Sequence, residues 1–92
     1  MPRFLIEVPH APTQAACDQA IKVFMDTGSH FFANADWGCE DGVHKAWFIV
    51  DIESKEAARQ ILPPLFRDKA SIIKLRKYSM ADVPDIQSGR IR

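Results

Sequence analysis

The chain has 92 residues, 47% of them apolar, and its 12 basic side chains balance its 12 acidic ones. This length suits one globular domain with a modest core. The zero net charge argues against a nucleic-acid partner, because a general polyanion binder needs a basic surplus. No apolar run approaches a membrane span and the N-terminus lacks the layout of a signal peptide, so we expect a cytoplasmic protein without a membrane partner.

The first two expected elements are a strand and a helix. Residues Arg3 to Val8 alternate apolar with other side chains, which predicts a strand buried mainly on one side. Thr13 is a suitable N-cap for a helix that reaches about Asp26. The apolar side chains of this helix recur at helical spacing and form one stripe of Cys17, Ala20, Ile21, Phe24 and Met25. We expect Cys17 to be a small buried hydrophobe, with both cysteines of the chain reduced.

The strongest local signal is a hairpin from Ser29 to Glu53. Asp41-Gly42 separates two runs rich in aromatic and β-branched residues, which predicts a two-residue type I′ turn. The register that follows opposes Asp36 to Trp47, Trp37 to Ala46, Asn34 to Ile49 and Cys39 to His44. Because side chains alternate along a strand, the hairpin then has one nearly apolar face and one mixed face.

A second helix and a last strand follow the hairpin. Ser54 is the expected N-cap of a helix over Lys55–Leu62, and Pro63-Pro64 ends this helix because proline removes a backbone donor. Leu65–Asp68 adds a short turn that tucks apolar side chains under the sheet. The pattern of Ala70–Tyr78 predicts the last strand. Its inner face is expected to carry Ile73 and Leu75, and its outer face Ile72, Lys74 and Arg76.

The order of these elements is βαββαβ, the ferredoxin-like pattern of an α+β domain. Right-handed crossovers predict a four-stranded antiparallel sheet of order 4-1-3-2 with both helices on one face. We assign residues 1–80 to this domain and residues 81–92 to a polar C-terminal tail.

The sheet face without helices, called the open face below, is expected to be unusually apolar. A solvated face should be mostly polar, and an apolar patch rimmed by charge marks an interface or a binding groove. We therefore expect a homodimer in which two open faces pack together. The large apolar residues assigned to this face are Leu5, Phe32, Trp47, Ile49 and Ile72, and the polar ones are Glu7, Asn34, Asp36, Lys45, Asp51, Lys74 and Arg76.

In its element order, the chain from Arg3 to Tyr78 resembles the dimeric α+β barrel proteins. The stretch Phe48–Ser54, followed by a helix that ends in Leu62–Phe66, is similar to the strand, helix and proline-Leu-Phe turn of the muconolactone isomerase family. This resemblance, which extends to the antibiotic-biosynthesis monooxygenases, implies a dimeric barrel that needs no cofactor. Arg67-Asp68-Lys69 replaces the aromatic segment that follows in the isomerases, so no catalytic residue is carried over.

The polar residues of the open face suit a small-molecule pocket. The candidate catalytic acids and bases are Glu7, His30 and Asp36, because carboxylates and imidazoles exchange protons when their surroundings tune them. The candidate ligand-binding residues are Phe32, Asn34, Lys45, Trp47 and Arg76. The competing interpretation is a structural ion pair between Glu7 and one of Lys45, Lys74 and Arg76.

A second candidate site lies at the turn of the hairpin. Cys39 and His44 face each other there, and a thiol beside an imidazole suits a metal ion or a nucleophile pair. Only these two ligands are evident, and Glu40 or Asp36 would have to complete the set. The leading expectation is therefore an ordinary hairpin end without a metal.

Two functions remain open. The first is a small homodimer that binds, or slowly transforms without a cofactor, a small organic molecule on the open face. The alternative is a non-catalytic structural or interaction module whose open face serves only oligomerisation. RNA stacking on Phe32 and Trp47 is not expected, because the RNP1-like run of RNA-recognition modules is missing.

Overall fold

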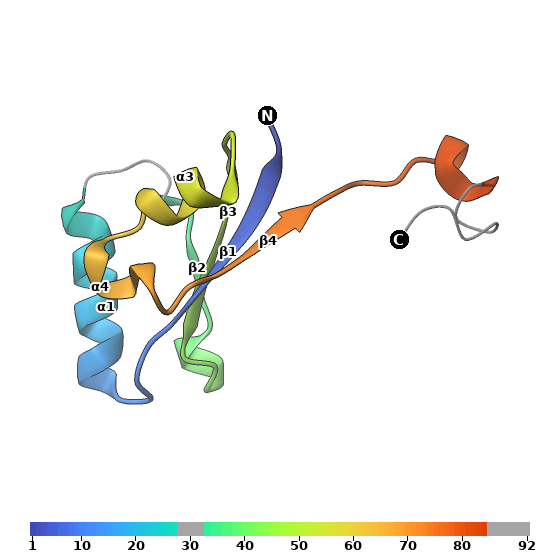
Figure 1. Ribbon diagram of the computed structural model, residues 1–92. Helices are drawn as coiled ribbons and strands as arrows, with labels where there is room; N and C mark the ends of the chain where they lie inside the picture. The colour runs from blue at the N-terminus through green and yellow to red at the C-terminus, as the bar shows by residue number, and fades with distance from the viewer. Residues whose placement is uncertain (28–32, 85–92) are drawn as a thin grey trace.

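The structure, a computed structural model, describes residues 1–27 and 33–84. Four strands pair in one antiparallel sheet. Helices pack against this sheet (Figure 1), which confirms the predicted α+β class. The strand order is β2-β3-β1-β4, which is 4-1-3-2 when it is read from the β4 edge. The strands are β1 (Arg3–Pro9), β2 (Asp36–Trp37), β3 (Lys45–Asp51) and β4 (Ser71–Leu75). The helices are α1 (Gln14–Asp26), α3 (Lys55–Gln60) and α4 (Pro64–Arg67), with short 3₁₀ helices η1 (Cys39–Asp41) and η2 (Met80–Asp82).

Both predicted helix caps are confirmed. The hydroxyl of Thr13 accepts a hydrogen bond from the backbone N–H of Ala16 at 3.1 Å, and α1 begins at the next residue. The hydroxyl of Ser54 accepts from the N–H of Ala57 at 3.0 Å, and α3 begins in the same way. Each cap satisfies a backbone donor that the first helical turn leaves free, which stabilises a helix by about 1 kcal/mol.

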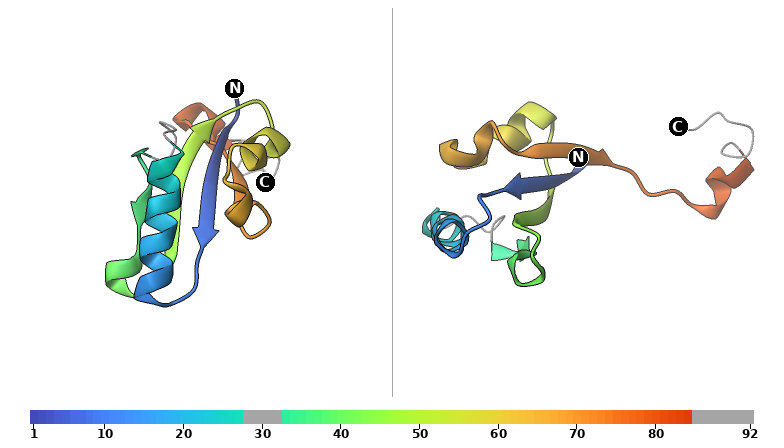
Figure 2. Two further views of the ribbon diagram at one scale, coloured as in Figure 1. Left: turned by 90° about the vertical axis from the view of Figure 1, so that its left-hand side faces the viewer. Right: turned by 90° about the horizontal axis from the view of Figure 1, so that it is seen from below.

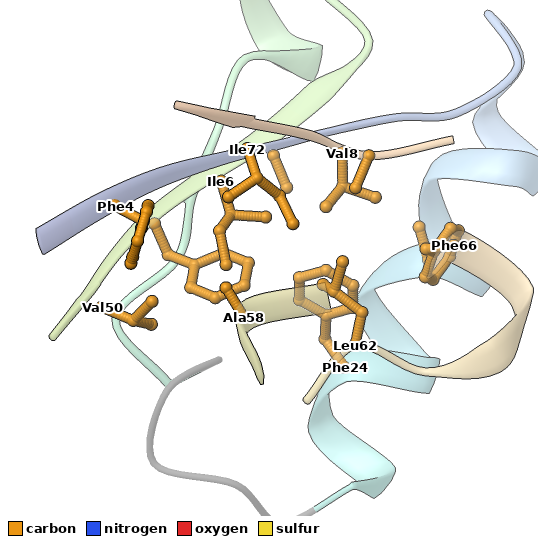
Figure 3. Close-up of a cluster of buried hydrophobic side chains, with 13 residues drawn as sticks. Phe4, Ile6, Val8, Phe24, Val50, Ala58, Leu62, Phe66 and Ile72 are labelled. Carbon is orange, nitrogen blue, oxygen red and sulfur yellow. The ribbon is translucent and has the colours of Figure 1, made fainter. Parts of the chain in front are cut away.

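The core lies between the helices and one face of the sheet, as Figures 2 and 3 show. Phe24 of α1 is at its centre, with ring centroids 5.1 Å from Trp37, 6.1 Å from Phe48 and 5.5 Å from Phe66. Burial of one such large side chain contributes about 1.5–3 kcal/mol. The strand residues that complete the core are Phe4, Ile6, Val8, Ala46, Phe48, Val50 and Ile72, and the helical ones include Ala20, Ala58 and Phe66.

The register of the hairpin is confirmed, but its first strand is shorter than predicted. Asp36 pairs with Trp47 and Trp37 pairs with Ala46, as the sequence pattern indicates. However, β2 contains only these two residues of the predicted strand, and Asn34 lies outside it. Ala33 is helical and Asn34 lies in a turn, so the chain enters β2 from a helical turn and not from an extended strand. The part of the prediction that falls on residues 28–32 lies outside the described residues.

The predicted type I′ turn at Asp41-Gly42 is wrong. Such a turn needs positive φ at both central residues, and of the described residues only Gly42 has one, at 77°. The chain instead curls from Gly38 through η1, and the N–H of Val43 donates back to the carbonyl of Gly38 at 3.0 Å. The loop is therefore wider than two residues, and it displaces Cys39 from the strand position assigned to it.

The predicted faces of β4 are also wrong. Ile72 is 8% exposed and faces the core, whereas Ile73 is 48% exposed on the open face. Ile72 pairs with Ile6 and Lys74 with Phe4, so these even-numbered residues share the helix-covered side. Because Ile72 and Ile73 are both apolar, either of them could face the core. The charged residues Lys74 and Arg76 suggest that Ile72 faces outward with them, which is incorrect. The pairing with β1 determines the true parity.

Beyond β4 the chain leaves the sheet as an extended arm, residues 76–84, which runs to η2 (Figure 1). The arm has contacts of its own. Ser79 and Asp82 form a capping box, and the guanidinium of Arg76 lies 4.7 Å from the ring centroid of Tyr78. Met80 is exposed at the far end. The predicted boundary between domain and tail at residue 80 stays a prediction, and residues 85–92 lie outside the described part.

Candidate functional site

The loop between β2 and β3 gathers the first cluster of functional side chains. Gly38 turns the chain into η1 at a position with no room for a side chain: a Cβ there would lie 2.7 Å from the carbonyl oxygen of Val43 and 2.9 Å from the Trp47 ring. The N–H of Gly42 closes η1 by donating to the carbonyl of Cys39 at 3.1 Å. This compact loop holds Cys39 against the end of β1.

His10 follows β1 and joins the loop from the other side. Its backbone N–H donates to the carbonyl of His44 at 3.0 Å, which continues the antiparallel ladder past the last pair, Pro9 with Lys45. The Sγ of Cys39 lies 3.2 Å from Nε2 of His10, where the direction of the hydrogen bond depends on the imidazole tautomer. We call His10, Cys39 and His44 the turn-end cluster.

The three side chains of the turn-end cluster lie close enough to share one ligand. One ligating atom from each residue falls within 4.8 Å of the other two. The two imidazole rings meet edge to face, with centroids 5.7 Å apart. The sequence predicted Cys39 and His44 here, with Glu40 or Asp36 to complete the set. In the structure, His10 is the third group that lies with Cys39 and His44.

Within the turn-end cluster, the surroundings of His10 favour its neutral imidazole. Burial and the nearby His44 lower the pKa of His10 below its ordinary value. A hydrogen bond with Cys39 and burial raise the pKa of Cys17 to about 11, so this neighbour stays a thiol. The Nδ1 atoms of His10 and His44 are buried without a hydrogen-bond partner among the described residues. The cluster therefore has ligating capacity that its neighbours in the described chain do not use.

A second polar cluster lies on the open face. The Oε1 of Glu7 accepts a hydrogen bond from Nε1 of Trp47 at 3.0 Å and lies 3.5 Å from Nζ of Lys45. We call these three residues the open-face cluster. Of the three cations that the sequence offered as partners for Glu7, Lys45 fills the role.

The remaining predicted site residues are scattered. Asp36 is exposed opposite Trp47 on the edge strand, and Asn34 is exposed outside the strand. Arg76 follows β4 and lies 3.9 Å from Asp82 in the arm. The candidates His30 and Phe32 fall outside the described residues.

Two surface hollows accompany these clusters. The first, of about 580 Å³, lies where the open face meets the start of the arm, and its lining includes Arg3, Ile49, Leu75 and Arg76. The second, of about 610 Å³, lies beside the turn-end cluster, and its lining includes Cys17, Asp36, Trp37, Cys39 and Glu40. Both are within the usual size range of small-ligand sites.

Neither the family models, the curated proteins nor the solved structures that were compared with this chain give a match. The resemblance to the dimeric α+β barrel proteins and the muconolactone isomerase family stays a prediction. In residues 1–27 and 33–84, no helix combines the length and apolar character required to span a membrane.

Proposed function

We propose that the protein is a small homodimer, assembled through its open face, that binds a small organic anion beside that face. The observation that carries the proposal is the uncovered apolar surface of the sheet. Ile49 is 56% exposed and Ile73 is 48% exposed, and Leu5 pairs with both across β1. A sheet face that served only as a solvated surface would be mostly polar.

The charges around this surface favour a second copy of the same chain as its cover. The ion pair of Arg3 and Asp51 lies at one end of the face, and that of Lys45 and Glu7 lies at the other. A two-fold interface brings the same patch of two subunits together. Because each ion pair joins one charge of either sign, these two pairs add no net repulsion between two copies in either direction along the strands.

The hollow at the start of the arm supports the binding of an anion. Its lining joins three cations, Arg3, Arg76 and Lys77, to a single carboxylate, Asp51. Its apolar wall includes Ile49 and Leu75. An organic acid matches both the charge and the apolar wall, because guanidinium groups bind carboxylates in a two-pronged geometry.

Binding is better supported than chemical transformation. Glu7 is four residues along β1 from Arg3, which is about 13 Å in a strand. The predicted base and the hollow therefore lie at opposite ends of the open face, and Asp36 lies on the far edge strand. Within one protomer, neither carboxylate is placed to exchange a proton with a molecule in the hollow.

The solution mass of the purified chain tests the assembly. We expect a dimer by light scattering on a sizing column, and a monomer for Ile49→Asp, which places a charge in the apolar surface. Leu65→Asp is the matched control, because Leu65 is half-exposed on α4, away from the open face. A monomeric wild type, or equal effects of the two variants, contradicts the proposal.

The ligand is tested by thermal shift with acetate, benzoate and succinate. We expect at least one of these anions to raise the melting temperature of the wild type, and Arg76→Ala to abolish the rise while the mass stays dimeric. A dimer that responds to none of them would instead favour the structural module, whose open face serves only assembly.

A further inference from the structure

The turn-end cluster brings together three residues that are far apart in the sequence. His10 follows β1, Cys39 opens η1 and His44 precedes β3. The antiparallel pairing of β1 with β3 and the curl of the loop produce this convergence. It lies on the helix-covered side beside Trp37, whose ring centroid is 6.1 Å from that of His10. The open face does not contribute to it.

Hairpin geometry alone does not account for the cluster. A buried polar atom without a partner costs about 1–3 kcal/mol, and two such atoms occur here, the Nδ1 of His10 and the Nδ1 of His44. An ordinary turn end would expose these rings to water or pair them. Here both rings are partly buried beside a thiol. The three side chains therefore suit a shared ligand.

The geometry points to a Zn²⁺ site in which Cys39, His10 and His44 are the three protein ligands. Zinc takes cysteine sulfur at about 2.3 Å and histidine nitrogen at about 2.0–2.1 Å, so tetrahedral ligand atoms lie roughly 3.3–3.6 Å apart. The sulfur of Cys39 and Nε2 of His10 are already 3.2 Å apart, and the whole set falls within 4.8 Å. Side-chain adjustments of about an ångström would close the site.

The donor set selects the class of metal. One thiolate and two imidazoles suit Zn²⁺, whereas Mg²⁺ and Ca²⁺ prefer carboxylate, carbonyl and water oxygens. Zn²⁺ binds histidine through the neutral imidazole. The thiol of Cys39 loses its proton to solvent when the Zn–S bond forms. The backbone hydrogen bond between His10 and His44 holds two of the ligands in place before the metal arrives.

Three protein ligands leave a fourth position for an exchangeable group. Structural zinc sites are closed by four protein ligands, whereas sites that act on or exchange a ligand keep one position open. Cys39 also lines the hollow of about 610 Å³ beside the cluster, together with Asp36 and Glu40. Because a ligand residue lines this hollow, water or a small ligand can reach the site from it. This site is independent of the proposed assembly through the open face.

The decisive experiment is a Zn²⁺ competition titration against a chromophoric chelator, with the full chain freed of metal. We expect one Zn²⁺ per chain, and a loss of affinity of at least about tenfold in each of Cys39→Ser and His44→Gln. Cys17→Ser is the matched control, because Cys17 contacts Cys39 but lies outside the three-residue set. We expect it to bind Zn²⁺ like the wild type. No binding by the folded wild type, or an equal loss in Cys17→Ser, overturns the three-ligand site.

A second measurement uses the wild-type chain alone. Iodoacetamide modifies exposed thiolates, and peptide masses distinguish Cys39 from Cys17. In the wild type, one equivalent of Zn²⁺ should slow the alkylation of Cys39 at least about tenfold, while the same amount of Mg²⁺ has no effect. Equal alkylation rates of Cys39 with and without Zn²⁺ contradict the site.

Discussion

The turn-end cluster and the open-face cluster are built from the same strands but differ in how their polar atoms are satisfied. Glu7 receives both the indole N–H of Trp47 and the ammonium of Lys45. The turn-end cluster has one short contact, between His10 and Cys39, and two buried ring nitrogens without a partner among the described residues. A paired carboxylate stabilises its own fold, whereas unpaired ligating atoms are available to bind something else.

The largest expected effect is the stabilisation of the turn-end cluster by metal. A ligand that binds only the folded state at 100 times its Kd raises the free energy of unfolding by about 2.7 kcal/mol. We expect urea titrations to show a gain of this size for the wild type in Zn²⁺, and for Glu7→Gln as well. Cys39→Ser should show none. A gain that survives in Cys39→Ser would place the metal elsewhere.

Gly38→Ala should damage both clusters at once. The added Cβ would lie 2.7 Å from the carbonyl oxygen of Val43 and 2.9 Å from the Trp47 ring. We expect overpacking to lower the free energy of unfolding by about 1–3 kcal/mol, and the Zn²⁺ affinity to fall with it. Gly42→Ala is the control: its Cβ meets open space, and only its left-handed backbone, at φ 77°, costs about 1 kcal/mol. No loss of stability in Gly38→Ala, measured by urea denaturation, would show that the close packing of Gly38 is unimportant.

The ion pair of the open-face cluster should contribute little to the free energy of unfolding. Glu7 and Lys45 are 29% and 41% exposed at their side chains, so water screens their attraction. Trp47→Phe removes the indole donor and should lower the free energy of unfolding by about 1 kcal/mol. Lys45→Gln should lower it by less than about 0.5 kcal/mol. Lys45→Gln should not alter Zn²⁺ affinity in the same titrations. A larger loss for Lys45→Gln than for Trp47→Phe would reverse the assigned roles.

The smallest expected effect is a pH dependence of the metal-free protein. Burial and His44 lower the pKa of His10 below its ordinary value of 6.5, so the unfolded chain binds more protons than the folded one just below that pH. The free energy of unfolding should therefore fall as the pH drops through 6.5 and level off below the folded pKa. In the presence of a metal chelator, His10→Gln should lack this decrease in the free energy of unfolding between pH 7.5 and 5.5. If the free energy of unfolding has the same pH dependence in the wild type and the variant, His10 is not its source.

The sequence predicts the fold through patterns that are local and repeated. The sequence identifies Thr13 and Ser54 as caps because each is a hydroxyl residue directly before a helix with an apolar stripe, where its side chain can accept a hydrogen bond from the first helical turn. The register of Asp36 with Trp47 followed from alternation on two strands at once. The faces of β4 could not be predicted, because Ile72 and Ile73 are adjacent and equivalent in the pattern. Only the pairing of Ile72 with Ile6 decides between them.

The candidate site was only half predictable for a similar reason. Cys39 and His44 lie close in the sequence, whereas His10 lies 29 residues from Cys39. The predicted strand order does contain the information that places His10 beside His44. Strand order 4-1-3-2 places β1 beside β3, and their antiparallel register brings Pro9 opposite Lys45, so the next pair along the ladder is His10 and His44. The curl of the loop at Gly38, which brings Cys39 to this pair, depends on packing against Trp47 that no local pattern encodes.

One spectrum tests the difference between the two clusters most directly. Proton–nitrogen NMR of the labelled full chain reports the imidazole nitrogens of His10 and His44 and the indole N–H of Trp47 in the same sample. With one equivalent of Zn²⁺, we predict large shifts of the His10 and His44 ring nitrogens and an unmoved Trp47 signal. Ring nitrogens that stay in place, or a Trp47 signal that moves as far as they do, would contradict the assignment of ligand binding to the turn-end cluster.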